Sequence, residues 1–193
     1  MNSKDAILQS LRENIKELFP KPEIKVSHIK FEDKVAQFKE IYQGVGGEVY
    51  ELQEGESVSD AIKRIYPNVK SLACNMPEVT CATINPDDID APADLNGTEL
   101  VVCKGIFGVC ENGAIYYEQQ YKQRAIYFIS ESLLFILPKS ELVDTMHEAM
   151  SRISHKFTGE FRGFISGPSK TADIEQALVK GAHGAKESAV LLI

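Results

Sequence analysis

The sequence has no run of apolar residues long enough to cross a membrane. Its most apolar stretch, residues 132–138, falls far short of the roughly 20 residues that a spanning helix needs. The N-terminal segment also lacks the uninterrupted apolar core of a secretory signal, because charged residues break every candidate. We therefore expect a protein without a membrane span that resides in the cytoplasm.

Basic residues are in the minority. The sequence contains 21 lysines and arginines against 28 aspartates and glutamates, which gives a formal net charge of −7. Proteins that bind nucleic acid carry a stripe of clustered lysine and arginine, and this sequence has none. We expect no nucleic-acid partner.

Cysteines are few, and their spacing is not that of a metal site. The two pairs, Cys74 with Cys81 and Cys103 with Cys110, each enclose six residues, whereas zinc ribbons and redox motifs enclose two. Free cysteine is often buried, so reduced core thiols are the expected role, with metal or redox use as the alternative. The spacing also fits no iron–sulfur motif. We expect no metal and no cofactor in this chain.

The motifs H-E-x-x-H, G-x-S-x-G and G-x-G-x-x-G are absent too, but helical and strand-like patterns alternate along the chain. Its 193 residues, 44% of them hydrophobic, suit a single α/β domain over residues 1–193. We expect a mixed, largely parallel sheet with flanking helices, and an N-terminal helical segment over residues 1–45 packed on it. The patterns predict helices over 3–19, 33–42, 57–66, 140–154 and 171–180, and strands over 48–52, 71–74, 98–103, 113–117, 125–129, 133–137, 163–166 and 187–193.

The first candidate for chemistry is Cys110-Glu-Asn-Gly-Ala114, which lies between two apolar strands. A carboxylate at such a turn would be partly desolvated, which would make Glu111 a better base or nucleophile. Asn112-Gly113 is also a favourable tight-turn dipeptide. A plain hairpin turn is therefore the alternative.

The second candidate is the small-residue loop after the strand over 163–166, together with the helix expected to follow it. Where a strand leads through such a loop into a helix, free backbone N–H groups and the helix dipole favour an anion. The hydroxyls of Ser169 and Thr171 would add contacts, whereas the carboxylates of Asp173 and Glu175 would oppose an anion. The structural alternative is that Ser169 or Thr171 caps the helix and Gly181 ends it.

His183 is expected just past the end of that helix, in Gly181-Ala-His-Gly184. The negative end of the helix dipole favours an imidazolium there. Such a histidine could act as an acid, a base or an anion partner near neutral pH. A local packing or capping role is the alternative.

These residues resemble a known family. The segment Ile165-Ser-Gly-Pro-Ser-Lys-Thr-Ala-Asp-Ile-Glu-Gln-Ala-Leu-Val-Lys-Gly-Ala-His-Gly184 is similar to the C-terminal signature of LUD-domain proteins of the lactate-utilisation protein C kind. That signature runs S-G-P-S-x-T-A-D-I-E, a short helix, then G-x-H-G-P, and Ala185 stands here where the family has proline. Upstream, Val109-Cys-Glu-Asn-Gly-Ala-Ile115 resembles the family's A-E-T-G-T segment, with Asn112 in place of threonine.

The resemblance implies a fold like that of ribose-phosphate isomerase, glucosamine-6-phosphate deaminase and the CoA transferases. It also implies a role in oxidising L-lactate to pyruvate, as a subunit or accessory factor beside an iron–sulfur protein and a cysteine-rich protein. The iron–sulfur clusters would lie on those partners, and a small carboxylate or other anion would be the ligand. A homo-oligomer is compatible with the sequence, and whether the isolated chain is an enzyme stays open.

A second hypothesis is a stand-alone enzyme, CoA-transferase-like or of another small-anion-binding type. CoA transferases of this fold form an acyl-glutamyl thioester on a glutamate in an E-N-G-like setting, which Glu111-Asn112-Gly113 resembles. Both hypotheses place one site at an edge of the sheet. Its expected catalytic residues are Glu111, Asp173 and His183, and its expected ligand-binding residues are Asn112, Gly113, Gly167, Ser169, Thr171, Glu175 and Gly184.

Overall fold

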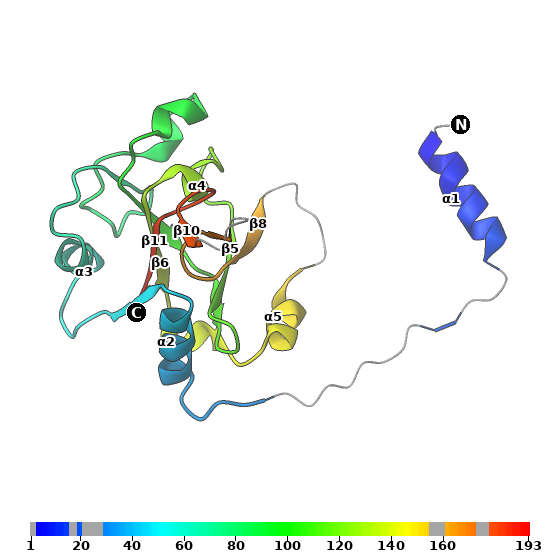
Figure 1. Cartoon of the computed structure of the whole chain (residues 1–193), viewed down its shortest axis with the longest axis horizontal. Coiled ribbons are helices and arrows are strands. Elements are labelled where there is room, and N and C mark those ends of the chain that lie inside the picture. The colour runs from blue at the N-terminus through cyan, green and yellow to red at the C-terminus, as the bar shows by residue number, and fades with distance from the viewer. Residues whose placement is uncertain (1–2, 16–18, 21–28, 155–160, 173–177) are drawn as a thin grey trace.

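The centre of the molecule is a five-stranded sheet in which all neighbouring strands run parallel (Figure 1). The computed structural model describes residues 3–15, 19–20, 29–154, 161–172 and 178–193. The strand order is β1-β11-β6-β3-β2, so the last strand of the chain lies between β1 and β6. The strands are β1 (Glu48–Glu51), β2 (Leu72–Ala73), β3 (Leu100–Lys104), β6 (Ser132–Leu137) and β11 (Glu187–Leu192), and the two covering helices are α2 (Lys34–Gly44) and α3 (Val58–Ile65).

One helix covers each face of this sheet. Val101 of β3 packs in one apolar cluster with Phe38 of α2, and its neighbour Val102 packs in another with Ile62 of α3. Successive side chains of a strand point to opposite faces, so a sheet covered on both sides needs strands that are apolar at every position. The uninterrupted apolar runs of β3, β6 and β11 meet this requirement, which confirms the expected α/β class.

A second sheet of four strands, in the order β7-β4-β5-β8, adds the antiparallel pairing that the successive strand patterns predicted. Its aromatic side chains stack, with the ring centroids of Phe107 and Tyr116 4.8 Å apart. A separate hairpin follows. The bounds are β4 (Phe107–Val109), β5 (Ala114–Glu118), β7 (Leu142–Val143) and β8 (Arg162–Ile165) in the sheet, and β9 (Lys170–Ala172) and β10 (Leu178–Lys180) in the hairpin.

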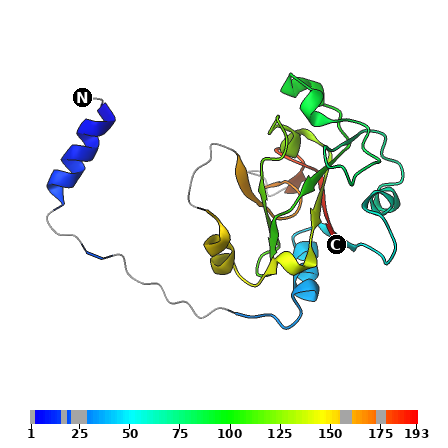
Figure 2. The same cartoon turned by 180° about the vertical axis from the view of Figure 1, so that it is seen from behind.

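The segment over residues 1–45 divides into two parts. In α2, Asp33 caps the first turn by accepting from Ala36 N at 2.9 Å, and Phe38 is fully buried. By contrast, α1 (Ser3–Asn14) has no buried residue and stands apart in both views (Figures 1 and 2). Thus α2 packs on the sheet, whereas α1 buries no side chain, and the expected packing of the whole segment over residues 1–45 stays a prediction. The single-domain division over residues 1–193 stays a prediction.

Three expected elements differ from the structure. Residues 125–129 form α4 (Ile126–Ile129) and not a strand, since a single helical turn buries Ile126 while leaving Phe128 at the surface. The helix expected over 140–154 starts only at α5 (Met146–Arg152), because Leu142 and Val143 pair with β4. In both places tertiary packing outweighs local propensity.

The third difference lies in the C-terminal signature. The sequence predicts a helix over 171–180. In the structure, the described residues of this range belong to two strands, β9 and β10, which pair antiparallel. Residues 173–177, which include Asp173 and Glu175, lie outside the described residues. Lys170 pairs with Lys180 across the two strands, so the described residues on either side of 173–177 form strands and not a helix.

Among the described residues, no helix combines the length and the apolar character that crossing a membrane requires. Short 3₁₀ turns occur at Pro86–Asp88, Pro92–Leu95 and Lys139–Glu141.

Candidate functional site

Residues 110–113 form the tight turn that joins β4 to β5. Gly113 N donates to Val109 O at 2.9 Å, and the Asn112 side chain accepts from Ala114 N at 3.1 Å. Gly113 has a φ of +66°, and a Cβ there would lie 3.3 Å from the backbone N and Cα of Tyr42 in α2. The hairpin-turn alternative is therefore confirmed, and glycine is needed both for its conformation and for the close approach of α2.

Glu111 lies at the first turn of α5. Its carboxylate accepts from Met146 N at 2.8 Å, and its own backbone N donates to Asp144 O at 3.0 Å. The first N–H groups of a helix have no partner within the helix, so this carboxylate supplies one. The side chain is exposed, and the expected desolvation of Glu111 was therefore wrong.

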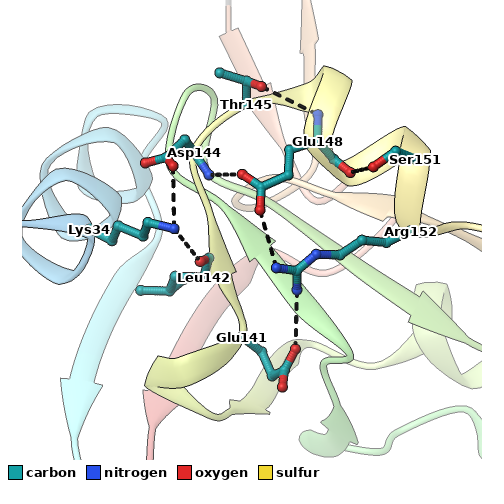
Figure 3. Close-up of polar contacts among 8 residues, drawn as sticks. All are labelled: Lys34, Glu141, Leu142, Asp144, Thr145, Glu148, Ser151 and Arg152. Carbon is teal, nitrogen blue, oxygen red and sulfur yellow. Dashed lines mark hydrogen bonds and ion pairs between the residues drawn. The ribbon is translucent and has the colours of Figure 1, made fainter. Parts of the chain in front are cut away.

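Asp144 is the centre of a polar network around this turn (Figure 3). It is 7% exposed, and its carboxylate accepts from Phe31 N at 3.0 Å and pairs with Lys34 Nζ at 3.3 Å. Burial raises the pKa of Asp144, but the hydrogen bonds from Phe31 and Lys34 outweigh it, and the net pKa is lowered. This one carboxylate thus ties the segment before α2 to the segment before α5.

The network continues onto α5 through Glu148. Its carboxylate accepts from Asp144 N at 3.1 Å and pairs with Arg152 at 3.2 Å, and Arg152 reaches Glu141 at 3.3 Å (Figure 3). The sequence patterns did not predict this network. Its one signal was the polar pair Asp144-Thr145 after two apolar residues, where Thr145 caps α5 by accepting from Glu148 N.

The two candidate segments meet, but Glu111 does not join them. Ser166 Oγ donates to Asn112 O at 2.9 Å, and Ile165 of β8 pairs with Ile115 of β5. The link therefore runs through a hydroxyl and a backbone carbonyl, while the Glu111 carboxylate binds the first turn of α5.

A cavity of about 240 Å³ lies between the two halves of the C-terminal signature. Residues 166–169 line one side of it and residues 183–185 line another. Ser169 N donates to Ala185 O at 2.9 Å, and a Cβ at Gly184 would come 3.3 Å from Ser169 Cβ. The small residues of the signature therefore let two loops bond along the cavity wall.

The remaining walls are apolar. Tyr127, Phe128, Leu133 and Ile165 line the cavity. The hydroxyl of Tyr127 is engaged with Gln120 N at 2.7 Å. An apolar chamber with a few polar groups at one side is the usual form of a small-molecule site.

Gly167 fixes the position of the loop against α2. Its φ is +70°, and a Cβ there would lie 2.9 Å from the carbonyl oxygen of Val45. Beside it, the Tyr42 hydroxyl shares a 2.6 Å hydrogen bond with Ser188 Oγ, and burial raises the pKa of Tyr42 to about 12. The loop thus packs against the end of α2, beside the buried and uncharged pair of Tyr42 and Ser188.

Of the predicted site residues, Asp173 and Glu175 lie outside the described residues, and the others fall into three groups. The cavity brings together Gly167, Ser169, His183 and Gly184. The adjacent turn holds Glu111, Asn112 and Gly113, and Thr171 belongs to β9. His183 follows β10 and not a helix, so the helix-dipole argument for its charge was wrong. The predicted site did not include Tyr127 and Phe128 of the apolar wall, because their aromatic run predicts a strand.

Comparisons with known proteins follow the same segments. A family model described as "LUD domain" matches residues 93–193. The "Lactate utilization protein C" of Shouchella clausii is 35% identical over 91 residues, which are 44% of this chain and 39% of that protein. The protein of the same name from Anoxybacillus flavithermus is 37% identical over 70 residues, 36% of this chain and 32% of that protein. The matches thus span about two fifths or less of these relatives' length.

A solved structure shares the fold. A DUF162 family protein from Deinococcus radiodurans aligns with a TM-score of 0.61 at 15% identity, covering 82% of this chain and 95% of that chain.

Proposed function

The chain belongs to the LUD-domain family, and on this ground we propose that it takes part in lactate utilisation. Its role is that of a subunit or accessory factor in a cytoplasmic system that oxidises L-lactate to pyruvate. The name of its relatives, lactate utilization protein C, supports the pathway. The observation that carries a binding role is the cavity walled by both halves of the signature, residues 166–169 and 183–185.

The cavity is suited to a small organic acid. Ser169 and His183 lie on its wall, and their side chains carry the donors that a carboxylate needs. Gly184 and Gly167 allow the backbone to approach a ligand closely. We propose that His183 and Ser169 hold the carboxylate, with the rest of the acid against the apolar wall.

Electron transfer is assigned to partner proteins. Oxidation of L-lactate to pyruvate releases two electrons and two protons, so the system needs an acceptor, which we propose to be iron–sulfur clusters on the partners. Burial raises the pKa of Cys110 to about 12 and holds the pKa of Cys103 well above its usual value. The thiolate is the form that binds metal, so these protonated core thiols support clusters that lie elsewhere.

The stand-alone alternative depends on a free carboxylate at Glu111. A CoA transferase needs that oxygen as its nucleophile. Here the carboxylate satisfies Met146 N, and Glu111 N is bound to Asp144 O. This structural role supports the accessory hypothesis over the CoA-transferase-like one.

The proposal is tested by purifying the tagged protein from its own cells grown on L-lactate. The eluate is examined by mass spectrometry, for iron and for lactate-dependent dye reduction. We expect iron–sulfur proteins and dye reduction in the eluate. Recovery of the chain alone, with neither iron nor activity, would overturn the subunit role, and labelling of Glu111 by an acyl-CoA would then favour the stand-alone enzyme.

A further inference from the structure

Helix α1 carries a stripe of exposed apolar side chains. Ile7, Leu8 and Leu11 are 59%, 39% and 57% exposed, and Ile15, which follows the helix, is 53% exposed. A backbone bond from Ile15 N to Arg12 O at 3.3 Å continues the helical turn to this residue. Side chains three or four positions apart lie on one face of a helix, so these four apolar residues form one continuous surface, the α1 stripe.

The opposite face of α1 is polar and is bonded within the helix. The Gln9 side chain donates to Glu13 Oε1 at 2.9 Å. With 12 residues, α1 has a length at which an isolated helix is only marginally stable in water. Most such helices are stabilised by packing of their apolar face. The α1 stripe therefore needs a surface to pack against.

The central sheet has a helix on each face without α1. One face packs with Phe38 of α2 and the other with Ile62 of α3. Elsewhere in the described part of the body, large exposed apolar side chains such as Phe128, Met150 and Val179 lie singly on different elements, α4, α5 and β10. These single side chains do not form a counterpart to the α1 stripe.

The charges beside the stripe are complementary to those of a second α1. Asp5 and Arg12 are exposed and lie seven residues apart on the same side of the helix, and neither forms an ion pair with another described residue. In an antiparallel pair with Leu8 against Leu11 of the second copy, Asp5 of each copy faces Arg12 of the other. Two ion pairs then form by symmetry.

A parallel pair of α1 helices fits less well. Each residue of the stripe would then meet its own counterpart, and Lys4, four positions before Leu8, would face Lys4 of the second copy. Like charges held together oppose association. In the antiparallel pair Lys4 lies beside Ile15 of the second copy instead, where its aliphatic stem covers the apolar side chain and its ammonium group stays in water.

The chain is long enough for this pairing. In both views α1 stands apart from the sheets (Figures 1 and 2). The body begins at Phe31, whose N is bound to Asp144, and the chain between Ile15 and Phe31 can span at most about 50 Å. An antiparallel pair of helices about 18 Å long attaches the two bodies at opposite ends. The two bodies therefore have room beside the paired helices.

We infer that α1 is a dimerisation element, which pairs antiparallel with α1 of a second copy of this chain. Leu8, Leu11 and Ile15 form the buried seam, and Asp5 and Arg12 fix its direction. The same surface is used by both copies, so the assembly closes at two. This inference does not depend on the proposed function, because α1 lines no part of the cavity formed by the signature.

The first test is the mass of the full chain in solution, measured by analytical ultracentrifugation over a range of concentrations. We expect a reversible dimer. Leu11→Glu should weaken it by at least about a hundredfold, because each dimer loses two buried leucines and gains two buried charges. Ser10→Glu introduces the same side chain outside the stripe and should leave the dimer unchanged. Since α1 buries no side chain in the single chain, both variants should keep the thermal transition of the body.

The second test exchanges the charges. Asp5→Arg places two arginines together at both ends of the pair and should weaken the dimer severalfold. The double variant with Asp5→Arg and Arg12→Asp restores opposite charges between the copies, so we expect the affinity of the wild type. Packing of α1 on its own sheet, or on a different protein, predicts no such rescue.

Three results would overturn the inference. A wild-type chain that is monomeric at every concentration would mean that its own sheet or another protein covers the α1 stripe. A dimer that survives Leu11→Glu would place the interface on another surface. A double charge exchange that fails to restore the affinity would exclude the antiparallel pair. None of these measurements needs lactate or iron–sulfur proteins, so the purification from lactate-grown cells tests the proposed function separately.

Discussion

The two segments that carry the family resemblance are built for different tasks. In the turn over residues 110–113, the Glu111 carboxylate, the Asn112 amide and the Gly113 backbone are each bound to neighbouring backbone groups. Residues 166–169 and 183–185 also bond to each other, but they do so along the wall of a cavity. The first segment holds β4, β5 and α5 together, and the second encloses space for a ligand.

This difference shows how one motif can hold both a support and a site. A carboxylate that satisfies a helix N–H is committed to the fold, whereas side chains that line a cavity are available to a ligand. Variants of the turn should therefore change stability, and variants of the wall should change binding.

Gly113→Ala should have the largest effect. Its φ of +66° strains any other residue, and the new Cβ would lie 3.3 Å from the backbone of Tyr42. We expect a loss of about 2–3 kcal/mol in the free energy of unfolding, measured by urea denaturation. The matched control is Gly55→Ala, where φ is +76° but nothing lies within 4 Å. Equal losses at both glycines would show that crowding against α2 adds nothing to the cost of Gly113→Ala.

Asp144→Asn should come next, because it removes the charge that Lys34 and Phe31 N share. We expect a loss of about 2 kcal/mol at neutral pH. The pKa of Asp144 is lowered in the folded state, so its contribution is present above the ordinary aspartate range and declines as pH falls through that lowered pKa. The gap between wild type and variant should thus shrink below about pH 4 in denaturation curves. A gap independent of pH would contradict the charged role.

Glu111→Ala should cost about 1 kcal/mol, the usual loss when a helix loses a capping side chain. Glu111→Gln keeps an acceptor for Met146 N and should stay within about 0.5 kcal/mol of wild type. Both variants should bind organic acids as the wild type does. Loss of binding in Glu111→Gln, with stability intact, would show that this residue binds the ligand instead of stabilising the fold.

Ser166→Ala should have the smallest effect on the fold. Ser166 Oγ donates to Asn112 O from an exposed position, so we expect a loss of about 0.5 kcal/mol. The same side chain lines the cavity, and a measurable change in acid binding is expected. A large loss of stability without a change in binding would make this residue part of the support.

The buried sheet was predictable because strands covered on both faces are apolar at every position. Residues 100–103 of β3, 133–137 of β6 and 189–192 of β11 have this property. Asp33 and Ser57 signalled the starts of α2 and α3. Each of these signals depends only on residues that are neighbours in the sequence, so these strands and helix starts could be predicted without knowledge of the fold.

The site was predicted only in part, because its geometry depends on contacts between distant segments. Gly167, Ser169, His183 and Gly184 were recognised and do line one cavity. The antiparallel pairing of β9 with β10 was not predicted. The local spacing of apolar residues favours a helix there, and contacts with the rest of the fold decide the pairing. Nor could spacing show that Met146 N would bind Glu111, which depends on where α5 begins.

The most direct test of the division between support and site is the titration of L-lactate into His183→Ala and Glu111→Ala beside the wild type. The account predicts that His183→Ala weakens binding by about tenfold, the usual loss of a hydrogen bond to a charged group, and leaves the melting temperature unchanged. It predicts that Glu111→Ala lowers the melting temperature and leaves the affinity unchanged. The opposite pattern, with affinity lost in Glu111→Ala and kept in His183→Ala, would contradict it.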